Sequence, residues 1–185
     1  MEGGNALADI LFGDVCPSGK LPYTVAKKEG DYPYFKSDIE RIEYEYYHGY
    51  TKMDKEETEV YYPFGYGLSY TSFEIGEPTV QTFADTCKIG VAIKNTGDCQ
   101  GAEVLQLYVG CEGSAVDRAV KVLKDFARVE LNAGEEKYIN LSVKKSDMAY
   151  YDEKKDDFVE EDITYIAYVG TSSAQKDLMQ VTFKF

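Results

Sequence analysis

The segment VAIKNTGDCQGAEVLQLYVG, Val91 to Gly110, decides the fold class of this sequence. Successive side chains of a β-strand point to opposite faces, so a period of two in hydrophobicity indicates a strand. In the second half of the segment, one face consists of Leu105, Leu107 and Val109. The opposite face is mixed and carries Val104, Gln106, Tyr108 and Gly110. We therefore predict a strand whose aliphatic face is the buried one.

The same alternation recurs after Ser72 in six runs, which are separated by turn residues such as NTGD and NAGE. The runs are CKIGVAIKN, AEVLQLYVG, VKVLKDFARVEL, EEKYINLSV, DITYIAYVG and LMQVTFKF. Short strands at this spacing are typical of an antiparallel β-sandwich, and we predict seven strands in two sheets. The core candidates are Leu105, Leu107, Val109, Ile139, Leu141, Ile166 and Tyr168.

A charged stretch, DMAYYDEKKDDFVEED, spans Asp147 to Asp162. It reads as two short strands that flank a solvated turn. A calcium loop of the EF-hand type would need a glycine at its sharp turn and a glutamate at a fixed spacing, and both are missing from DEKKDD. We therefore predict a hairpin without a bound ion.

The part before Ser72 does not show this regular alternation of apolar and polar residues. Asn5 to Phe12 has helical spacing with one apolar stripe, and we expect Asn5 to be its N-cap and Gly13 to end it. A short extended run is expected at Leu21 to Val25. From Lys27 to Glu59 the sequence is polar, rich in tyrosine and without clear period. We expect this excursion to lie across some other surface.

The aromatic segment YYPFGYGLSY, Tyr61 to Tyr70, links the two parts, and we call it the connector. Tyrosine offers a large contact area with only two side-chain torsions to fix, so it suits a half-wet interface. Glycine lets the backbone bend where a Cβ would obstruct it. We expect domain packing by Tyr61, Tyr62, Pro63, Phe64, Gly65, Tyr66, Gly67 and Tyr70; a sugar-binding platform is the alternative.

Composition narrows the partners and the location. The net charge of −13 repels nucleic acid and anionic lipid, so we expect neither as a partner. No signal peptide or spanning helix is evident at the start, which favours a cytoplasmic protein. The four cysteines have no CxxC pair, so we expect free thiols, with a disulfide as the alternative.

No cofactor or metal site is indicated by the sequence. GGNALA lacks the spacing of a dinucleotide-binding loop and has no P-loop lysine. His48 is the only histidine, so it supports no metal centre or triad, and we expect an interface role for it. The acidic residues Asp14, Asp31, Glu43 and Glu45 are expected to be solvated carboxylates.

Four motifs carry a family resemblance, in this order: GGNALADILFGDVCPSGKLPYTV, YYPFGYGLSYTSF, VAIKNTGDCQGAEVLQLYVG and RAVKVLKDFARVELNAGEEKYINLSV. Together they resemble the C-terminal portion of glycoside hydrolase family 3, which includes β-glucosidases and β-xylosidases. The resemblance implies that residues 1–71 are the remnant of an α/β sandwich domain with the connector. Residues 72–185 would form a fibronectin type III-like, immunoglobulin-like β-sandwich. It also implies that Met1 corresponds to an internal methionine of longer members.

The resemblance carries functional expectations as well. Complete members hydrolyse β-glycosidic bonds with a nucleophile in a barrel domain and an acid/base residue upstream of GGNALADILFGD. We therefore expect no catalytic residue here, an inactive isolated chain and a structural, domain-packing role. The expected partners are the missing barrel and α/β domains of such an enzyme, or a second copy of this chain. The alternative is a stand-alone carbohydrate-binding or protein-interaction module.

The chain departs from the family pattern in two places. EYYHGYTKMD, Glu45 to Asp54, carries Thr51 where members commonly have an arginine, which puts any contact of that arginine in doubt. In RAVKVLKDF, Arg118 to Phe126, the departures are Ala119, Val122 and Asp125, and we expect these changes at the surface.

Overall fold

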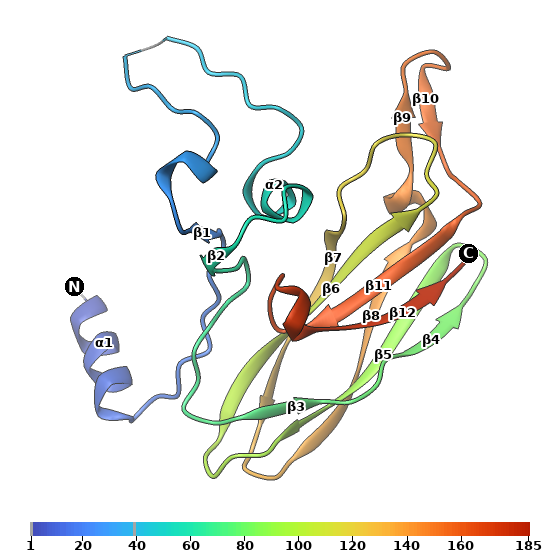
Figure 1. Ribbon diagram of the computed structural model, residues 1–185. Helices are drawn as coiled ribbons and strands as arrows, with labels where there is room; N and C mark the ends of the chain where they lie inside the picture. Colours follow the sequence, from blue (N-terminus) through green and yellow to red (C-terminus); the bar gives the residue numbers. More distant parts are fainter. Residues whose placement is uncertain (1, 39) are drawn as a thin grey trace.

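The computed structural model describes residues 2–38 and 40–185 (Figure 1). Its helices are α1 (Gly3–Phe12) and α2 (Gly49–Lys55), with short 3-10 turns η1 (Glu29–Asp31), η2 (Lys145–Met148) and η3 (Gln175–Asp177). The strands outside the sandwich are β1 (Val25–Ala26), β2 (Val60–Tyr62), β9 (Tyr150–Asp152) and β10 (Asp157–Val159). The sandwich strands are β3 (Phe73–Ile75), β4 (Thr79–Thr82), β5 (Thr86–Asn95), β6 (Gly101–Glu112), β7 (Val122–Leu131), β8 (Glu136–Lys144), β11 (Thr164–Gly170) and β12 (Leu178–Phe183).

Two antiparallel sheets form the sandwich, as the alternating runs predict. One sheet has the order β12-β11-β6-β7, and in the other β5 pairs with β3, β4 and β8. Strands β3 and β4 pair with successive parts of β5 and are separated by Gly76, Glu77 and Pro78. Counted as one strand interrupted by this Gly and Pro, they give the predicted seven-strand plan.

The core lies between the two sheets. Leu105, Leu107 and Val109 of β6 are at most 1 % exposed, which confirms the buried aliphatic face predicted for this strand. Burying a side chain of this size stabilises the fold by about 1.5–3 kcal/mol. The other large side chains buried with them include Ile89, Val91, Ile93, Leu131, Leu141, Val143 and Tyr165, and Ile139 packs against the cluster from its edge.

The prediction that Ile166 and Tyr168 of β11 point into the core is wrong. Tyr165, Ala167 and Val169 point into the core, whereas Ile166 is half-buried on the outer face. Tyr168 is only 8 % exposed, but it also lies on the outer face, where it pairs with Tyr108 of β6. Both faces of β11 carry apolar residues, so alternation alone does not distinguish the inner face from the outer one.

Helix α1 forms close to its expected position but differs at its start. It begins at Gly3 with Glu2 in the N-cap position, so the expected Asn5 cap is wrong; the Asn5 amide instead donates to the Glu2 carboxylate. Gly13 ends the helix in the left-handed region with φ 87°, as predicted. None of the helix residues is buried, and Figure 1 shows α1 standing apart from the sandwich.

The excursion from Lys27 to Glu59 also stands away from the sandwich for most of its length (Figure 1). It contacts the sandwich mainly through α2, a helix that the sequence did not predict. The hydroxyl of Thr51 accepts the backbone N–H of His48 and donates to its carbonyl, which closes the first turn. On the expected Leu21–Val25 run, only Val25 enters a strand, β1, which pairs with β2.

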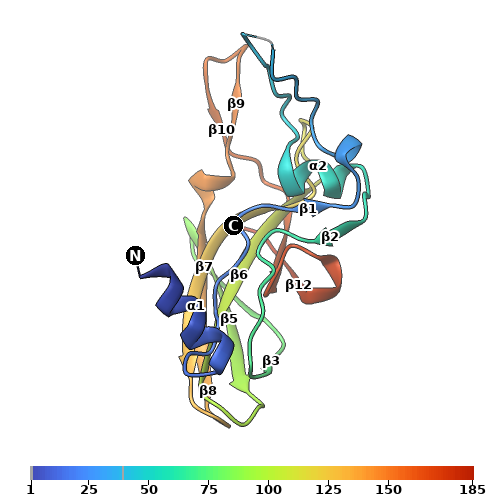
Figure 2. The same cartoon turned by 90° about the vertical axis from the view of Figure 1, so that its left-hand side faces the viewer.

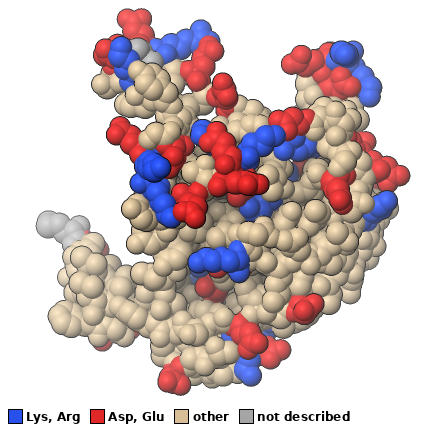
Figure 3. Space-filling model, viewed as in Figure 1, with Lys and Arg blue, Asp and Glu red and all other residues tan. Residues whose placement is uncertain are grey.

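The predicted hairpin of the charged stretch is confirmed as β9 and β10. Tyr151 and Phe158 pack edge to face on it, with ring centroids 5.4 Å apart. Figure 3 shows charged side chains of both signs gathered on the excursion and the hairpin, while the surface of α1 is mostly uncharged. No helix in the described part of the chain is long and apolar enough to cross a membrane.

Candidate functional site: the connector and the sheet face beneath it

The connector begins in β2, contacts the outer face of the β12-β11-β6-β7 sheet at Gln106 of β6 and leads to β3 (Figure 2). Its eight candidate residues differ in exposure. Gly65 is buried, whereas Tyr61, Tyr62 and Tyr70 are exposed, at 63 %, 47 % and 54 %. The remaining four, Pro63, Phe64, Tyr66 and Gly67, are half-buried. The contact with the sheet is thus made by the middle of the connector.

Gln106 of β6 holds the middle of the connector. Its side-chain amide donates to the carbonyl oxygens of Gly65 at 3.2 Å and Thr171 at 2.7 Å, and its oxygen accepts the Tyr108 hydroxyl at 2.5 Å. Burial raises the pKa of Tyr108 well above its ordinary value, so the hydroxyl stays protonated and donates. The buried amide therefore has both of its ends satisfied, which is the condition for a polar group to be stable there.

Gly65 is required by geometry at this contact. Its φ is +78°, in the left-handed region, and a Cβ at this position would lie 2.1 Å from the Gln106 amide oxygen. Gly67 has a similar steric limit, since its Cβ would lie 2.5 Å from the carbonyl oxygen of Gly19. The two glycines let the connector lie against β6 on one side and against the chain around Gly19 on the other.

Aromatic rings fill the space next to Gln106. Tyr50 of α2 stacks on Phe64 of the connector with centroids 4.9 Å apart, and meets Tyr108 edge-on at 5.7 Å. The Tyr50 hydroxyl accepts the backbone N–H of Leu123 at 2.9 Å, and burial raises the pKa of this tyrosine. Each such ring pair adds about 0.5–1.5 kcal/mol beyond its buried area.

Backbone hydrogen bonds fix the connector on both sides. Gly65 N–H donates to the Leu21 carbonyl, and Leu21 N–H donates to the Tyr66 carbonyl, both at 2.8 Å. On the other side, Ser173 N–H donates to the Phe64 carbonyl at 2.9 Å. The connector therefore ties residues near Leu21 to the loop that follows β11.

A buried ion pair fastens α2 to the sandwich. The Lys121 ammonium lies 2.6 Å from an Asp54 carboxylate oxygen, and its side chain is 2 % exposed. Burial raises the pKa of Asp54, although Lys121 opposes that shift. A second contact, between Lys55 and Asp117 at 2.8 Å, lies at the surface. Ala119 beside this site is only 6 % exposed, so its expected surface position is wrong: α2 and the chain leading to it cover that edge.

Neither Gln106 nor Lys121 was predicted from the sequence as a contact residue, and the sequence pattern indicates burial for only one of them. The central part of the second face of β6, Val104, Gln106, Tyr108 and Gly110, contains no charged residue, which is typical of a strand covered on both faces. Lys121 sits among other charged residues in RAVKVLKDF, and nothing in that pattern separates a buried lysine from an exposed one.

The remaining candidates show no catalytic arrangement. His48 is exposed, and its ring contacts the Tyr46 carbonyl at 3.2 Å. Asp14, Glu43 and Glu45 are exposed and Asp31 is half-buried. All four cysteines are free, and Cys16 contacts the Ser69 hydroxyl at 3.2 Å. Over residues 2–38 and 40–185, no group of three or more His, Cys, Asp or Glu side chains is placed to hold a metal ion.

Two family models match the chain. Residues 1–70 match the glycosyl hydrolase family 3 C-terminal domain, and residues 103–173 match the fibronectin type III-like domain. The second match lies within the sandwich, and the first ends at Tyr70, the last residue of the connector.

Curated relatives align with nearly the whole chain. Beta-glucosidase BoGH3A of Bacteroides ovatus is 40 % identical over 185 residues, covering 93 % of this chain and 25 % of the relative. The beta-glucosidase of Kluyveromyces marxianus is 41 % identical over 179 residues, covering 93 % and 21 %. The chain thus spans about a quarter of the length of the curated relatives that it matches.

Solved structures of beta-glucosidases and of a beta-D-glucoside glucohydrolase also superpose on this chain. The crystal structure of the Kluyveromyces marxianus beta-glucosidase in complex with glucose superposes with a TM-score of 0.89 at 40 % identity, covering 98 % of this chain and 22 % of that one. The Trichoderma reesei beta-D-glucoside glucohydrolase gives 0.91 at 31 % identity, covering 99 % and 29 %. The likeness includes the N-terminal segment as well as the sandwich, since coverage of this chain is nearly complete.

Proposed function

The chain belongs to glycoside hydrolase family 3, and from this premise we propose that it serves as the C-terminal packing module of a β-glucosidase. In this role the sandwich holds the N-terminal segment, residues 2–70, in the position from which that segment completes an α/β domain. Hydrolysis of β-glucosides is then the activity of the whole enzyme. A (β/α)8 barrel takes about 250 residues, which is more than this chain contains.

The observation that carries this proposal is the exposed apolar face of α1 and the turn after it. Leu7, Leu11, Phe12 and Val15 are exposed by 56 %, 69 %, 85 % and 51 %. Exposed apolar side chains grouped in this way mark an interaction site. We assign their partner to the remainder of the α/β domain of the same β-glucosidase.

The connector has a defined part in this proposal. Its eight residues, Tyr61, Tyr62, Pro63, Phe64, Gly65, Tyr66, Gly67 and Tyr70, fasten the N-terminal segment to the sandwich. The hydrogen bonds at Gly65 and Tyr66 and the stacking of Phe64 on Tyr50 support this role. The ring of Phe64 is engaged by protein, which argues against an open sugar platform at this position.

A chimeric enzyme tests the proposal. The matching C-terminal region of the Kluyveromyces marxianus beta-glucosidase is replaced by these 185 residues, and hydrolysis of an aryl β-glucoside is measured. We expect the chimera to be active and the 185-residue chain alone to stay at background. Leu11→Asp should reduce the activity of the chimera at least tenfold, because it places a charge against the covering domain.

The control is Phe158→Asp on the β9-β10 hairpin, because Phe158 and Leu11 are both 69 % exposed. Equal activity of the two variants would contradict the role of α1. Turnover by the purified chain alone, lost when one of its own carboxylates is changed, would contradict the non-catalytic role. For the connector, Phe64→Ala should increase proteolysis near Lys27 to Lys36 while the sandwich keeps its cooperative unfolding.

A further inference from the structure

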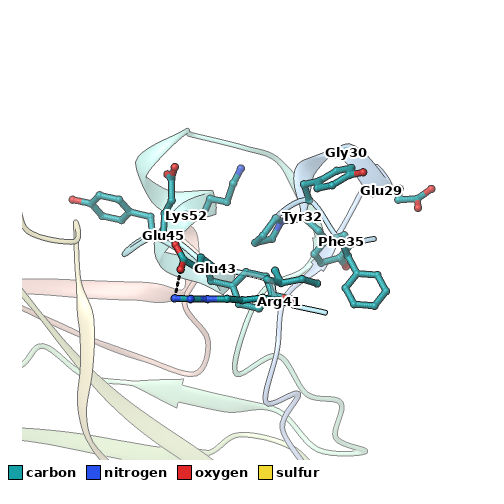
Figure 4. A pocket seen from close by; sticks show the side chains of 13 residues that line it. Glu29, Gly30, Tyr32, Phe35, Arg41, Glu43, Glu45 and Lys52 are labelled. Carbon is teal, nitrogen blue, oxygen red and sulfur yellow. Dashed lines mark ion pairs between the residues drawn. The ribbon is translucent and has the colours of Figure 1, made fainter. Parts of the chain in front are cut away.

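The two limbs of the excursion enclose a hollow that the proposed function does not use (Figure 4). Most residues of the ranges 29–35 and 41–47 line it, together with Lys52 of α2, and its volume is about 1010 Å³. Small-molecule sites typically have about 300–1,000 Å³ and are lined by apolar and aromatic groups with a few polar ones. The hollow is therefore large enough for an oligosaccharide.

Aromatic rings dominate the lining. Tyr34, Phe35 and Tyr44 are exposed by 76 %, 68 % and 59 %, so their faces meet water and no other part of the described chain covers them. Tyr32 and Tyr47 complete the lining, and Tyr32 is held in place because its hydroxyl accepts the Ala26 N–H at 2.8 Å. This differs from the connector, where the Phe64 ring is packed against Tyr50.

Charged groups stand among these rings. Arg41 pairs with Glu43 on the same limb (Figure 4), and Lys52 of α2 pairs with Glu56 one turn further along the helix. Glu29 and Glu45 also line the hollow, so their carboxylates offer hydrogen-bond acceptors there, while Arg41 and Lys52 supply donors.

We propose that this hollow is a non-catalytic sugar-binding site for a neutral β-gluco-oligosaccharide. The C–H faces of a pyranose ring stack on aromatic rings, and its hydroxyl groups donate to carboxylates and accept from arginine and lysine. A phosphate or other anion is disfavoured, because three glutamates outnumber the two cations in the lining. The choice of a glucoside among neutral sugars rests on family membership, whereas the site itself does not depend on the proposed packing role.

The site would hold a sugar near the enzyme and would not catalyse a reaction. An enzyme that holds a soluble substrate or a chain end near its surface raises the local concentration of that substrate, and the geometry of the link sets the effective concentration. No bond is made or broken in the hollow, so binding is measurable on this chain alone. That separates its failure from failure of the packing role, which is measured by hydrolysis in the chimera.

Calorimetric titration of the 185-residue chain with cellobiose tests the proposal. We expect saturable binding, a loss of affinity of at least tenfold in Phe35→Ala and in Tyr44→Ala, and a smaller loss in Glu45→Gln. Both rings are exposed, so the thermal unfolding of these variants should match that of the wild type. Phe158→Ala is the matched control, since Phe158 is 69 % exposed and Phe35 is 68 % exposed.

Two results would overturn the proposal. One is that cellobiose shows no saturable binding, or that its affinity is the same in Phe35→Ala and Tyr44→Ala as in the control Phe158→Ala. The other is that the same two variants spare cellobiose binding but reduce activity of the chimera, which would make the excursion a protein contact surface.

Discussion

The sandwich and the N-terminal segment differ in where their apolar side chains go. The sandwich buries a continuous core between its two sheets, with Ile89, Leu105 and Leu107 fully inaccessible. Of the buried hydrophobic residues, only Ala26 and Met53 belong to residues 2–70 as described. The sandwich therefore contains the apolar contacts that stabilise it, whereas the shape of the N-terminal segment depends on surfaces that lie outside that segment.

The largest expected effect contrasts two leucines. Leu105→Ala should lower the free energy of unfolding of the sandwich by about 3–5 kcal/mol, because the side chain is fully buried and leaves a cavity. Leu11→Ala on α1 should change it by no more than about 0.5 kcal/mol, since Leu11 is 69 % exposed. Urea denaturation of the two variants measures the difference, and comparable losses would break the distinction between the two parts.

The next effect concerns the ion pair that joins them. Asp54→Leu should loosen α2 from the sandwich by about 3 kcal/mol, because it leaves Lys121 buried without a partner. The control is Asp117→Leu, which removes the surface pair with Lys55 and should cost at most about 1 kcal/mol. Hydrogen exchange of the α2 amides separates the two variants, since only Asp54→Leu should expose them.

A double variant sharpens this test. Asp54→Leu combined with Lys121→Met removes both charges, so α2 should regain most of its protection. If the double variant is as unprotected as Asp54→Leu alone, an unpaired lysine is not the cause of the loss.

The third effect is at the connector. Gly65→Ala should cost about 1–3 kcal/mol, because its φ of +78° strains any side chain and the new Cβ meets the Gln106 amide. Limited proteolysis should show faster cleavage in the excursion, with unchanged cutting of the sandwich. Gly134→Ala is the matched control: it has a φ of +76° but no atom within 4 Å of its Cβ. Equal proteolysis of the two variants would mean that the Gln106 contact does not hold the connector.

The same contrast explains how much the sequence could predict. A strand with one wet face leaves a period of two, and this signal located the sandwich and the inward face of β6. It failed for Ile166 and Tyr168 because β11 is apolar on both faces, with the outer face carrying Tyr168 opposite Tyr108. Alternation of apolar and polar residues identifies the face of a strand that packs into the core. Where a second surface also covers the sheet, both faces are apolar and the alternation no longer identifies the inner one.

The N-terminal segment was less predictable for a related physical reason. Helix α2 has seven residues and buries only Met53, so there is no apolar stripe to reveal it. The connector was located by its aromatic and glycine content, but the partner that holds it, Gln106, lies 41 residues away from Gly65. Contacts of this kind are made between distant segments, and no local pattern specifies them.

The smallest effect lies inside the sandwich and depends on pH. The Glu161 carboxylate accepts the Ala115 N–H at 2.7 Å, the Ser114 hydroxyl at 2.7 Å and the Arg118 guanidinium at 2.8 Å. Burial by itself would raise its pKa, but these donors together hold the pKa below its ordinary value. The site therefore favours the charged carboxylate in the folded state and ties the loop after β6 to the chain before β11.

The sign of the pH dependence follows from that lowered pKa. A carboxyl group whose pKa is lower in the folded state stabilises the protein above its unfolded pKa, and this stabilisation is lost as the pH falls through the folded value. Glu161→Gln should therefore cost about 1 kcal/mol at pH 7, as expected for weakened hydrogen bonds to a charged group. The difference in free energy of unfolding between this variant and the wild type should shrink as the pH falls below 4.5, the ordinary pKa of a glutamate.

Urea midpoints at several pH values measure this difference, and Glu160→Gln, at a more exposed neighbouring position, is the control. Because Glu161 belongs to the sandwich, its loss should lower the cooperative transition of the core and leave proteolysis of the excursion unchanged; the reverse pattern would show that the two parts do not unfold separately.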